Sequence, residues 1–431
     1  MPDSNQRISH SIAASVTSQD AESLAVSVAQ QIILDHASPI HDTTVLPLKQ
    51  ALGRVLAVDV ISPINVPAHD NSAMDGYALR SADLASAEPV TLKVAGRALA
   101  GHAYAGQVHA GECVRIMTGA VIPKGCDCVL PQEAVLSATD AEAVLPAASA
   151  KAGDNLRRAG EDLALGQIAL PQGRLLTPAD IGLLASLGMA EVAVFRKLRV
   201  AYFSTGDELR SVGQPLDEGS VYDSNRYTLH GMLMRLGCEP VDMGVIRDDP
   251  ASIEAALRDG CQQADAVITS GGVSAGDADH TRRMMDKLGD VAFWKLAMRP
   301  GRPLAFGKLD IGGKCAPLFG LPGNPVAVMV SFYFFVRPAL LRMMGAAPAA
   351  LPVIRARSLN DIRKKSGRTE YQRGIASTDS DGQLSVRVTG AQGSGILSSM
   401  SEANCMIILS DSQTSIQTGD RVNVLMFDGL I

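Results

Sequence analysis

The residues best suited to phosphate and metal chemistry lie together between positions 264 and 280. A short apolar run, Ala266–Ile268, breaks into a serine, two adjacent glycines and then two carboxylates, which in order are Ser270, Gly271, Gly272, Asp277 and Asp279. Adjacent glycines let backbone N–H groups approach a phosphate closely, because no Cβ stands in the way. Carboxylate oxygens suit a divalent cation. The segment therefore predicts a buried strand, an anion-binding turn and a metal-binding arm.

A second interpretation of the same segment is a nucleophile elbow, because Gly272–Gly276 matches the pattern G-x-S-x-G with Ser274 as its serine. The order of the triad residues argues against this interpretation. In α/β-hydrolases the histidine follows both the serine and a later acid, whereas the last histidine of this chain is His280. The acids between Ser274 and His280 are too near in sequence to build a triad across a sheet, so we reject a serine hydrolase.

A cationic turn provides a second possible anion site. Arg299 and Arg302 stand in Met298–Pro303, where two prolines and a glycine stiffen the backbone, and Lys295 lies just upstream. Guanidinium groups at a fixed separation suit bidentate contact with a tetrahedral oxyanion or a phosphate. Surface arginines are often only solvated, but the rigid backbone favours a site, and we expect an anion to bind here.

Three further loops that follow predicted strands are candidates for ligand binding. They are Ser204–Glu208, Tyr222–Asn225 and Gly320–Pro325. The first two fit either a ligand site or the caps of the helices that follow them. The third fits either a ligand-binding turn or ordinary turn chemistry. Open α/β sheets bind ligands at the carboxyl ends of their strands, so we expect all five loops to gather at that edge.

The elements that must position these loops alternate between strand and helix from residue 196 to residue 347. Strands are predicted at Val200–Phe203, Val241–Ile246, Ala266–Ile268, Leu304–Phe306 and Pro317–Phe319, and helices at Arg226–Leu236 and Pro250–Ala264. This alternation predicts a parallel sheet covered on both faces. Short strands between Gly and Pro turns predict a β-rich domain at 68–150 and a small C-terminal β-barrel at 348–431.

Composition narrows the class of protein. A chain of 431 residues suggests three or four domains, and 46% hydrophobic with 19% charged residues is typical of a globular protein. A net charge of −6, without a basic run interleaved with aromatics, gives no support for nucleic-acid binding. The seven cysteines are odd in number and scattered, which argues against a disulfide framework.

The N-terminal segment and the apolar runs predict the cellular location of the protein. Residues 1–20 are polar and aperiodic and predict a flexible tail. No signal peptide is apparent, and the apolar run Val326–Val336 is too short for a membrane span. We therefore expect a cytoplasmic protein that does not bind membranes.

Several longer motifs together resemble one known family. They are Asp70–Ala78 (DNSAMDGYA), Arg115–Ala120 (RIMTGA), Gly160–Asp162 (GED), Ser204–Glu208 (STGDE) and Leu321–Pro325 (LPGNP). In identity and order they resemble the molybdopterin molybdenumtransferase family, the MoeA proteins, which are related to the E domain of gephyrin. The resemblance runs from about residue 22 to the C-terminus.

The resemblance implies a multidomain α/β plus β fold. Its parts would be a central parallel α/β (MogA-like) domain at 196–347, the β-rich domain, the C-terminal barrel, and a discontinuous linking domain of helices and strands at 21–67 and 151–195. It also implies an elongated homodimer, in which the β-rich domain faces the partner's α/β domain across a cleft, and transient contact with other proteins of molybdenum-cofactor biosynthesis. The implied reaction inserts molybdate into the dithiolene of adenylylated molybdopterin and releases AMP, assisted by Mg²⁺ or another divalent cation.

The resemblance further implies roles for individual residues. The catalytic and metal-binding carboxylates would be Asp279, Glu208 and Asp248. The molybdate pocket would contain Arg299, Arg302, Arg373 and Ser394. The other substrate-binding residues would be Asp75, Thr118, Asp162, Ser270, Gly271, Gly272, Ser274, Lys295, Pro322 and Pro325.

Departures from the family's pattern occur at three positions. The family usually has lysines where this chain has Arg299 and Arg302, and commonly a serine where this chain has Ala327. Arginine keeps the charge but is larger and forks its donors, so the geometry of anion binding changes. Ala327 removes a hydroxyl and with it one expected ligand contact.

Two alternative functions are consistent with part of the pattern. A molybdopterin adenylyltransferase would share the α/β domain and its glycine turn, but the separate motifs at Asp70–Ala78 and Arg115–Ala120 argue against it. A non-catalytic scaffold that binds the pterin or a protein partner belongs to a different class. The acidic residues and the arginine turn favour an enzyme over a non-catalytic scaffold, although a binding protein could also keep these residues.

Overall fold

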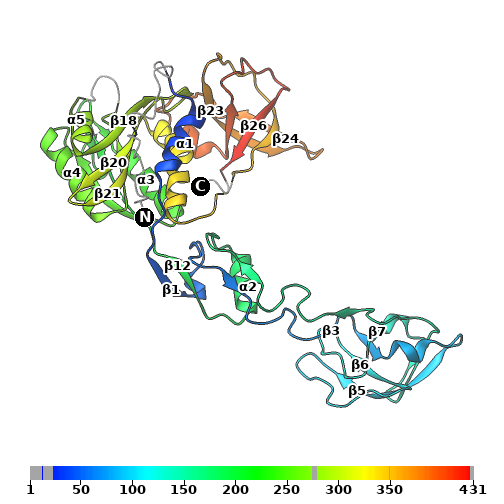
Figure 1. Ribbon diagram of the computed structural model, residues 1–431. Coiled ribbons are helices and arrows are strands. Elements are labelled where there is room, and N and C mark those ends of the chain that lie inside the picture. Colours follow the sequence, from blue (N-terminus) through cyan, green and yellow to red (C-terminus); the bar gives the residue numbers. More distant parts are fainter. Residues whose placement is uncertain (1–11, 13–22, 274–278, 349, 428–431) are drawn as a thin grey trace, which may run out of the picture.

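The computed structural model describes residue 12 and residues 23–273, 279–348 and 350–427, which form an elongated molecule (Figure 1). An α/β sheet and a C-terminal barrel lie together at one end. A narrow connecting region with β1 (Thr43–Pro47), β12 (Glu191–Phe195) and α2 (Pro178–Ser186) leads to a β-rich sheet at the other end. The α/β sheet and the β-rich sheet of one chain are therefore far apart.

The central sheet has six strands. In spatial order they are β16 (Glu239–Ile246), β13 (Arg199–Thr205), β17 (Ala266–Ser270), β21 (Lys314–Leu321), β20 (Pro303–Ile311) and β18 (Gly289–Lys295). β16, β13, β17 and β21 are parallel, as the sequence predicted, but β20 is antiparallel to both of its neighbours. The reason is a two-residue hairpin, since Gly312 and Gly313 both have positive φ (61° and 82°), which such a turn requires.

Both faces of this sheet are buried. Side chains alternate along β13, so that Tyr202 belongs to one apolar cluster and Phe203 to another on the opposite face. The helices of this region are α3 (Ser224–Arg235), α4 (Pro250–Gln263), α5 (Asp279–Leu288), α6 (Pro325–Ser331) and α7 (Arg337–Met343). Leu229 of α3 joins the Tyr202 cluster, and Leu257 of α4 joins the Phe203 cluster. Helices thus cover both faces, as predicted.

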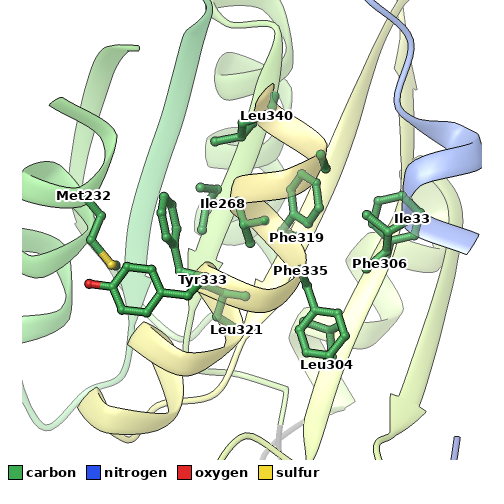
Figure 2. Close-up of a cluster of buried hydrophobic side chains, with 14 of the residues drawn as sticks. Ile33, Met232, Ile268, Leu304, Phe306, Phe319, Leu321, Tyr333, Phe335 and Leu340 are labelled. Carbon is green, nitrogen blue, oxygen red and sulfur yellow. The ribbon is translucent and has the colours of Figure 1, made fainter. Parts of the chain in front are cut away.

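The larger cluster also includes the first helix, α1 (Val26–His36), as Figure 2 shows for Ile33. Ile33 is fully buried, and the ring of His36 meets Phe306 edge to face at 6.3 Å. From the sequence, residues 21–67 are expected to belong to the linking domain. By packing, α1 instead belongs to the α/β core, because the apolar partners of its buried side lie there.

A continuous helical run, Pro325–Met343, contains α6, the π-helical turn Phe332–Val336 and α7. The apolar stretch Val326–Val336, on which the sequence prediction rests, is too short for a membrane span, whereas the full run has sufficient length and hydropathy. However, 67% of its most apolar window is buried inside the protein. Tyr333 and Leu340 contribute to the core cluster (Figure 2), so the run packs as a core helix.

The C-terminal region forms a closed barrel, which confirms the prediction of a small barrel. Its strands are β22 (Ile354–Ser358), β23 (Thr369–Thr378), β24 (Leu384–Val388), β25 (Cys405–Leu409) and β26 (Arg421–Met426). They close into a ring because β23 pairs with both β24 and β25. A short strand from the α/β region, β19 (Met298–Arg299), also pairs with β23 and fixes the arginine turn against the barrel.

The connecting region is built from two stretches of sequence. β1 pairs with β12, and β2 (Val60–Ile61) pairs with β11 (Ile168–Leu170), so segments on either side of the β-rich sheet meet. Thr177 and Asp180 form a capping box at the start of α2, and Arg174 binds the Asp180 carboxylate at 3.0 Å. These contacts give the connection defined secondary structure.

The β-rich sheet completes the molecule. Its strands in spatial order are β7 (Cys128–Pro131), β4 (Gly76–Leu79), β6 (Glu112–Ile116), β5 (Val90–Ala98), β9 (Glu142–Leu145) and β8 (Ser137–Ala138). The remaining short elements are β3 (Asn71–Ser72), β10 (Leu156–Arg157), β14 (Leu209–Arg210), β15 (Val221–Tyr222), α8 (Ser398–Glu402) and the 3-10 turns η3 (Leu48–Gln50), η4 (Ser81–Leu84) and η5 (Gln132–Ala134).

Candidate functional site

The loops at one edge of the central sheet hold most of the predicted site residues. The register aligns Ser204 of β13 with Ser270 of β17, and Ser270 with Leu321 of β21, so these strand ends lie side by side. β20 begins opposite Lys295, where β18 ends. The turn Arg299–Arg302 therefore reaches the same edge although β20 runs in the opposite direction. The five loops gather there, as the sequence predicted.

Charge is distributed unevenly along this edge. Glu208 and Asp248 follow β13 and β16, the glycine turn follows β17, and the arginine turn lies between β18 and β20. Neighbouring strands are about 4.8 Å apart, so the three steps from β13 to β20 span about 14 Å. The edge thus presents an acidic end and a basic end to an extended ligand.

The glycine turn after β17 has no room for side chains. Gly271 (φ 94°) donates its N–H to the Leu321 carbonyl at 3.1 Å, and a Cβ there would lie 2.5 Å from the backbone oxygen of Thr205. A Cβ on Gly272 (φ 68°) would lie 2.5 Å from the Thr281 hydroxyl. Among the described residues, the buried hydroxyls of Thr205 and Thr281 have no hydrogen-bond partner. Only glycine fits at these two positions, and the unsatisfied hydroxyls beside them are donors from which an oxyanion could accept hydrogen bonds.

Two polar residues before and within α3 brace this turn. Asn225 donates to the Ser270 hydroxyl at 2.8 Å and to the Gly323 carbonyl at 2.7 Å, and so joins the ends of β17 and β21. Asp223 caps α3 and accepts the Ser204 hydroxyl at 3.0 Å. Ser270 is buried, and its hydroxyl accepts the hydrogen bond from Asn225 that joins the two strand ends. The sequence singled out this loop but did not identify Asn225 as the residue that bridges two strand ends.

The acidic end is formed by the loops after β13 and β16. The Glu208 carboxylate folds over Gly206, where an added Cβ would lie 2.6 Å from Oε2. The N–H of Asp248 lies 3.5 Å from the carboxylate of Asp207. The two loops are therefore in contact through the backbone of Asp248 and the side chain of Asp207.

The third predicted carboxylate follows the glycine turn. Asp279 is the first residue of α5, but its side chain, like the whole of Ser274, lies outside the described residues. Among the side chains that are described, no three His, Cys, Asp or Glu form a group suited to a metal ion. The donors at this end, Glu208 and Asp248, are nevertheless the hard oxygen ligands that Mg²⁺ prefers.

Arg299 and Arg373 line one cavity of about 360 Å³ between the arginine turn and the barrel. Arg373 is fully buried; it donates to the Ser399 hydroxyl at 2.9 Å and to the carbonyls of Gln392 (3.3 Å) and Gly393 (3.0 Å). All these acceptors are neutral. Because burial is not offset by a carboxylate, it lowers the pKa of Arg373 to about 10. The cavity is lined by three arginines, Arg299, Arg363 and Arg373, and by two carboxylates, Asp361 and Glu370, and this excess of positive charge favours an anion in it.

Ser394 lies where the barrel meets the Leu321–Pro325 turn. Its carbonyl accepts the N–H of Val326 at 3.0 Å, at the start of α6. Pro322, in that turn, is buried, and Pro325 is the first residue of α6. The turn and the barrel are thus held together beside the anion cavity.

The structure separates the remaining predicted cations from that cavity. Lys295 and Arg302 are exposed at the edge of the sheet, and neither lines the cavity that contains Arg373. Ala327 is buried, and its carbonyl would lie 3.6 Å from a Cβ on Gly301 in the arginine turn. The backbone of Ala327 therefore lies beside the arginine turn.

The remaining predicted residues lie outside the α/β edge and the barrel, with Asp75 and Thr118 in the β-rich domain and Asp162 in the linking domain. Asp75 accepts the N–H of Thr118 at 2.7 Å and its hydroxyl at 2.8 Å, and these hydrogen bonds hold the pKa of Asp75 below its ordinary value. Asp162 is exposed and is anchored by its N–H to the Val66 carbonyl at 3.0 Å. Asp75 and Thr118 adjoin β4 and β6, and in a single chain the sheet that contains these strands lies far from the α/β sheet (Figure 1).

Family models match three successive parts of the chain. Residues 24–188 match the MoeA N-terminal region (domain I and II), residues 201–342 a probable molybdopterin binding domain, and residues 355–427 the MoeA C-terminal region (domain IV). The α/β edge and the barrel cavity thus fall in the second and third matches, and the Asp75–Thr118 pair in the first.

Whole-chain relatives agree with these matches. The molybdopterin molybdenumtransferase of Haemophilus influenzae is 42% identical over 390 residues, covering 90% of this chain and 95% of the relative. That of Nostoc sp. is 35% identical over 89% of this chain and 88% of the relative. A crystal structure of a molybdopterin biosynthesis moeA protein from Pyrococcus horikoshii is 30% identical, covers 94% of this chain and all 100% of its own, and has a TM-score of 0.80. This chain belongs to the molybdopterin molybdenumtransferase (MoeA) family.

Proposed function

We propose that this protein inserts molybdate into the dithiolene of adenylylated molybdopterin and releases AMP. The observation that carries the proposal is Arg373, a fully buried cation that has no carboxylate partner among the described residues and lines a cavity of about 360 Å³. A tetrahedral dianion would supply the missing counter-charge. The molybdopterin molybdenumtransferases to which the chain is similar support this choice of oxyanion.

The glycine turn suits the phosphates of the pterin substrate. Gly271 and Gly272 leave no room for a Cβ, and the hydroxyls of Thr205 and Thr281 beside them have no hydrogen-bond partner within the described residues. A phosphate oxygen at the turn would accept hydrogen bonds from these hydroxyls, which find no acceptor among the described residues. The pterin end of the ligand would then extend along the edge toward the arginines.

We propose that Glu208, Asp248 and Asp279 hold Mg²⁺ at the acidic end. Mg²⁺ commonly takes one or two carboxylates and completes its shell with water and substrate phosphates, so a three-residue cluster is not required. The ion would neutralise phosphoryl oxygens and so favour departure of AMP. The carboxylates would hold and orient the ion, and none of them is proposed as a nucleophile.

The site would be completed by a second subunit. In a homodimer, Asp75, Thr118 and Asp162 of one subunit would face the α/β edge of its partner, and the separation of the β-rich sheet from the α/β sheet within one chain supports this arrangement (Figure 1). Transient contact with other proteins of molybdenum-cofactor biosynthesis is part of the proposal. All seven cysteines are free thiols, which supports a reducing, cytoplasmic setting.

The test combines the purified protein with adenylylated molybdopterin, Mg²⁺ and molybdate and measures AMP. The proposal expects AMP release that depends on molybdate. Binding without turnover would identify a scaffold, and release of pyrophosphate from ATP and molybdopterin would identify an adenylyltransferase. Asp279→Ala should abolish AMP release while pterin binding persists, and unchanged release in that variant would refute the proposed metal site.

A further inference from the structure

A second cavity, of about 670 Å³, adjoins the one that contains Arg373, and we call it the outer basic cavity. Three residues line both spaces, namely Arg299, Arg363 and Glu370. The outer basic cavity adds the cations Lys364, Lys365 and Arg368. Five cationic side chains therefore face a single carboxylate, in a chain whose net charge is −6.

The loop that carries these cations is fixed by backbone hydrogen bonds. Ile362 and Ile416 exchange N–H···O bonds of 2.8 and 2.9 Å across the barrel. The N–H of Thr369 reaches the Ala297 carbonyl at 2.9 Å, just before β19 pairs with β23. The cations are thus presented by a framework that is already ordered, which lowers the entropic cost of binding a ligand.

One of the cations is buried. Lys364 is only 6% exposed, and its ammonium donates to the carbonyls of Gln413 (2.8 Å) and Lys365 (3.1 Å). Two of its three donors are occupied by neutral acceptors, and it forms no ion pair within the described residues. A buried ammonium without a carboxylate is unfavourable unless an anion compensates it.

The exposed cations are also uncompensated. Arg299, Arg363, Lys365 and Arg368 form no ion pair in the described part of the chain, and the carboxylate of Glu370 accepts a hydrogen bond from Gln372 at 3.0 Å. Exposed cations alone would fit an ordinary solvated surface. The buried Lys364 and the wall shared with the Arg373 cavity favour a ligand site.

We propose that the outer basic cavity captures a small tetrahedral dianion from solution and passes it across Arg299 and Arg363 to Arg373. The proposal rests on the proposed function, in which molybdate is that dianion. A chain of net charge −6 repels a dianion at long range, and a local excess of positive charge raises the encounter rate. The effect should weaken with salt, because these cations are largely exposed.

The kinetic test uses the double variant Lys365→Ala/Arg368→Ala, which removes two exposed charges from the outer basic cavity. The matched control is Arg355→Ala/Arg357→Ala, two exposed arginines of β22 that line neither cavity. We expect the KM for molybdate to rise roughly tenfold at low salt, with kcat within about twofold of wild type and a weaker salt dependence. The control should match wild type. A KM and a salt dependence unchanged in the test variant would overturn the proposal.

A binding test separates this proposal from the proposed function. Equilibrium dialysis of molybdate, with sulfate as competitor, is applied to Arg373→Gln protein with and without Lys365→Ala/Arg368→Ala. We expect weak dianion binding by the single variant and its loss in the triple variant, with thermal melting as the check on folding. If this result holds but no AMP is ever released, the capture site stands and the transferase proposal fails. If AMP is released but neither binding nor KM changes, the capture site is wrong.

Discussion

Replacing Arg373 by glutamine should remove most of the protein's affinity for molybdate. Burial lowers the pKa of Arg373 from an ordinary value of 12.5 to about 10, and at about 1.4 kcal/mol per pKa unit the buried charge is disfavoured by about 3 kcal/mol. A bound dianion would recover that free energy. Since about 1.4 kcal/mol corresponds to a factor of ten in affinity, Arg373→Gln should raise the Kd for molybdate by about two orders of magnitude.

The same pKa sets the pH dependence of binding. The dianion needs the protonated guanidinium, which predominates in the free protein below about pH 10. The contribution of Arg373 to the affinity of the wild-type protein for molybdate should therefore be constant from neutral pH to just below about pH 10. It should then fall as the pH rises through about 10, approaching tenfold per pH unit.

Isothermal titration with molybdate, and with sulfate as a second tetrahedral dianion, measures both effects. The control is Arg387→Gln, which removes an equal charge from an exposed position on β24 of the same barrel. A Kd for Arg373→Gln within threefold of wild type would refute the reasoning. So would an equal loss of affinity in the control, because the effect would then come from general charge.

Gly272→Ala should lower the free energy of unfolding in urea by about 3 kcal/mol, because the added Cβ would meet a neighbouring hydroxyl. The control is Gly188→Ala, which is also at positive φ but in open space and should lower the free energy of unfolding by about 1 kcal/mol. Asp180→Asn should lower the melting temperature at neutral pH. Burial alone would raise the pKa of Asp180, but hydrogen bonds from a neighbouring arginine and threonine hold the pKa below its ordinary value. The stabilisation is therefore present above about pH 4 and is lost as the pH falls. An equal drop in melting temperature at about pH 2 would contradict this. Inactive Asp75→Ala and Arg373→Gln subunits, when mixed and allowed to exchange, should regain about a quarter of wild-type activity, since half of the dimers would carry one intact site; no recovery would argue against a shared site.

Much of the α/β sheet could be predicted from the sequence because its signals are local. Apolar runs that end in glycine or polar residues marked β13, β16 and β17, and Pro250 marked the start of α4. The direction of β20 was missed, although Gly312 and Gly313 between two apolar runs are a hairpin signal. The placement of α1 was not predictable in this way, because its apolar partners are distant in sequence.

The anion cavity could not be derived from local pattern. Arg373 stands in an unremarkable Gln-Arg-Gly sequence, and only the resemblance to the family pointed to it. Its burial depends on Ser399 and on carbonyls of Gln392 and Gly393, which approach only when the barrel closes. The outer basic cavity has the same origin, since its cations meet Arg299 through the pairing of β19 with β23.

The central claim is that this site couples molybdate binding to AMP release. The most direct measurement is a single turnover with excess protein, adenylylated molybdopterin, Mg²⁺ and isotopically labelled molybdate, in which AMP and pterin-bound molybdenum are quantified together. We predict one AMP released for each molybdenum incorporated, neither product without molybdate, and loss of both in Arg373→Gln while that variant still binds the adenylylated pterin. AMP release that continues at the wild-type rate without molybdate, or in Arg373→Gln, would contradict the account.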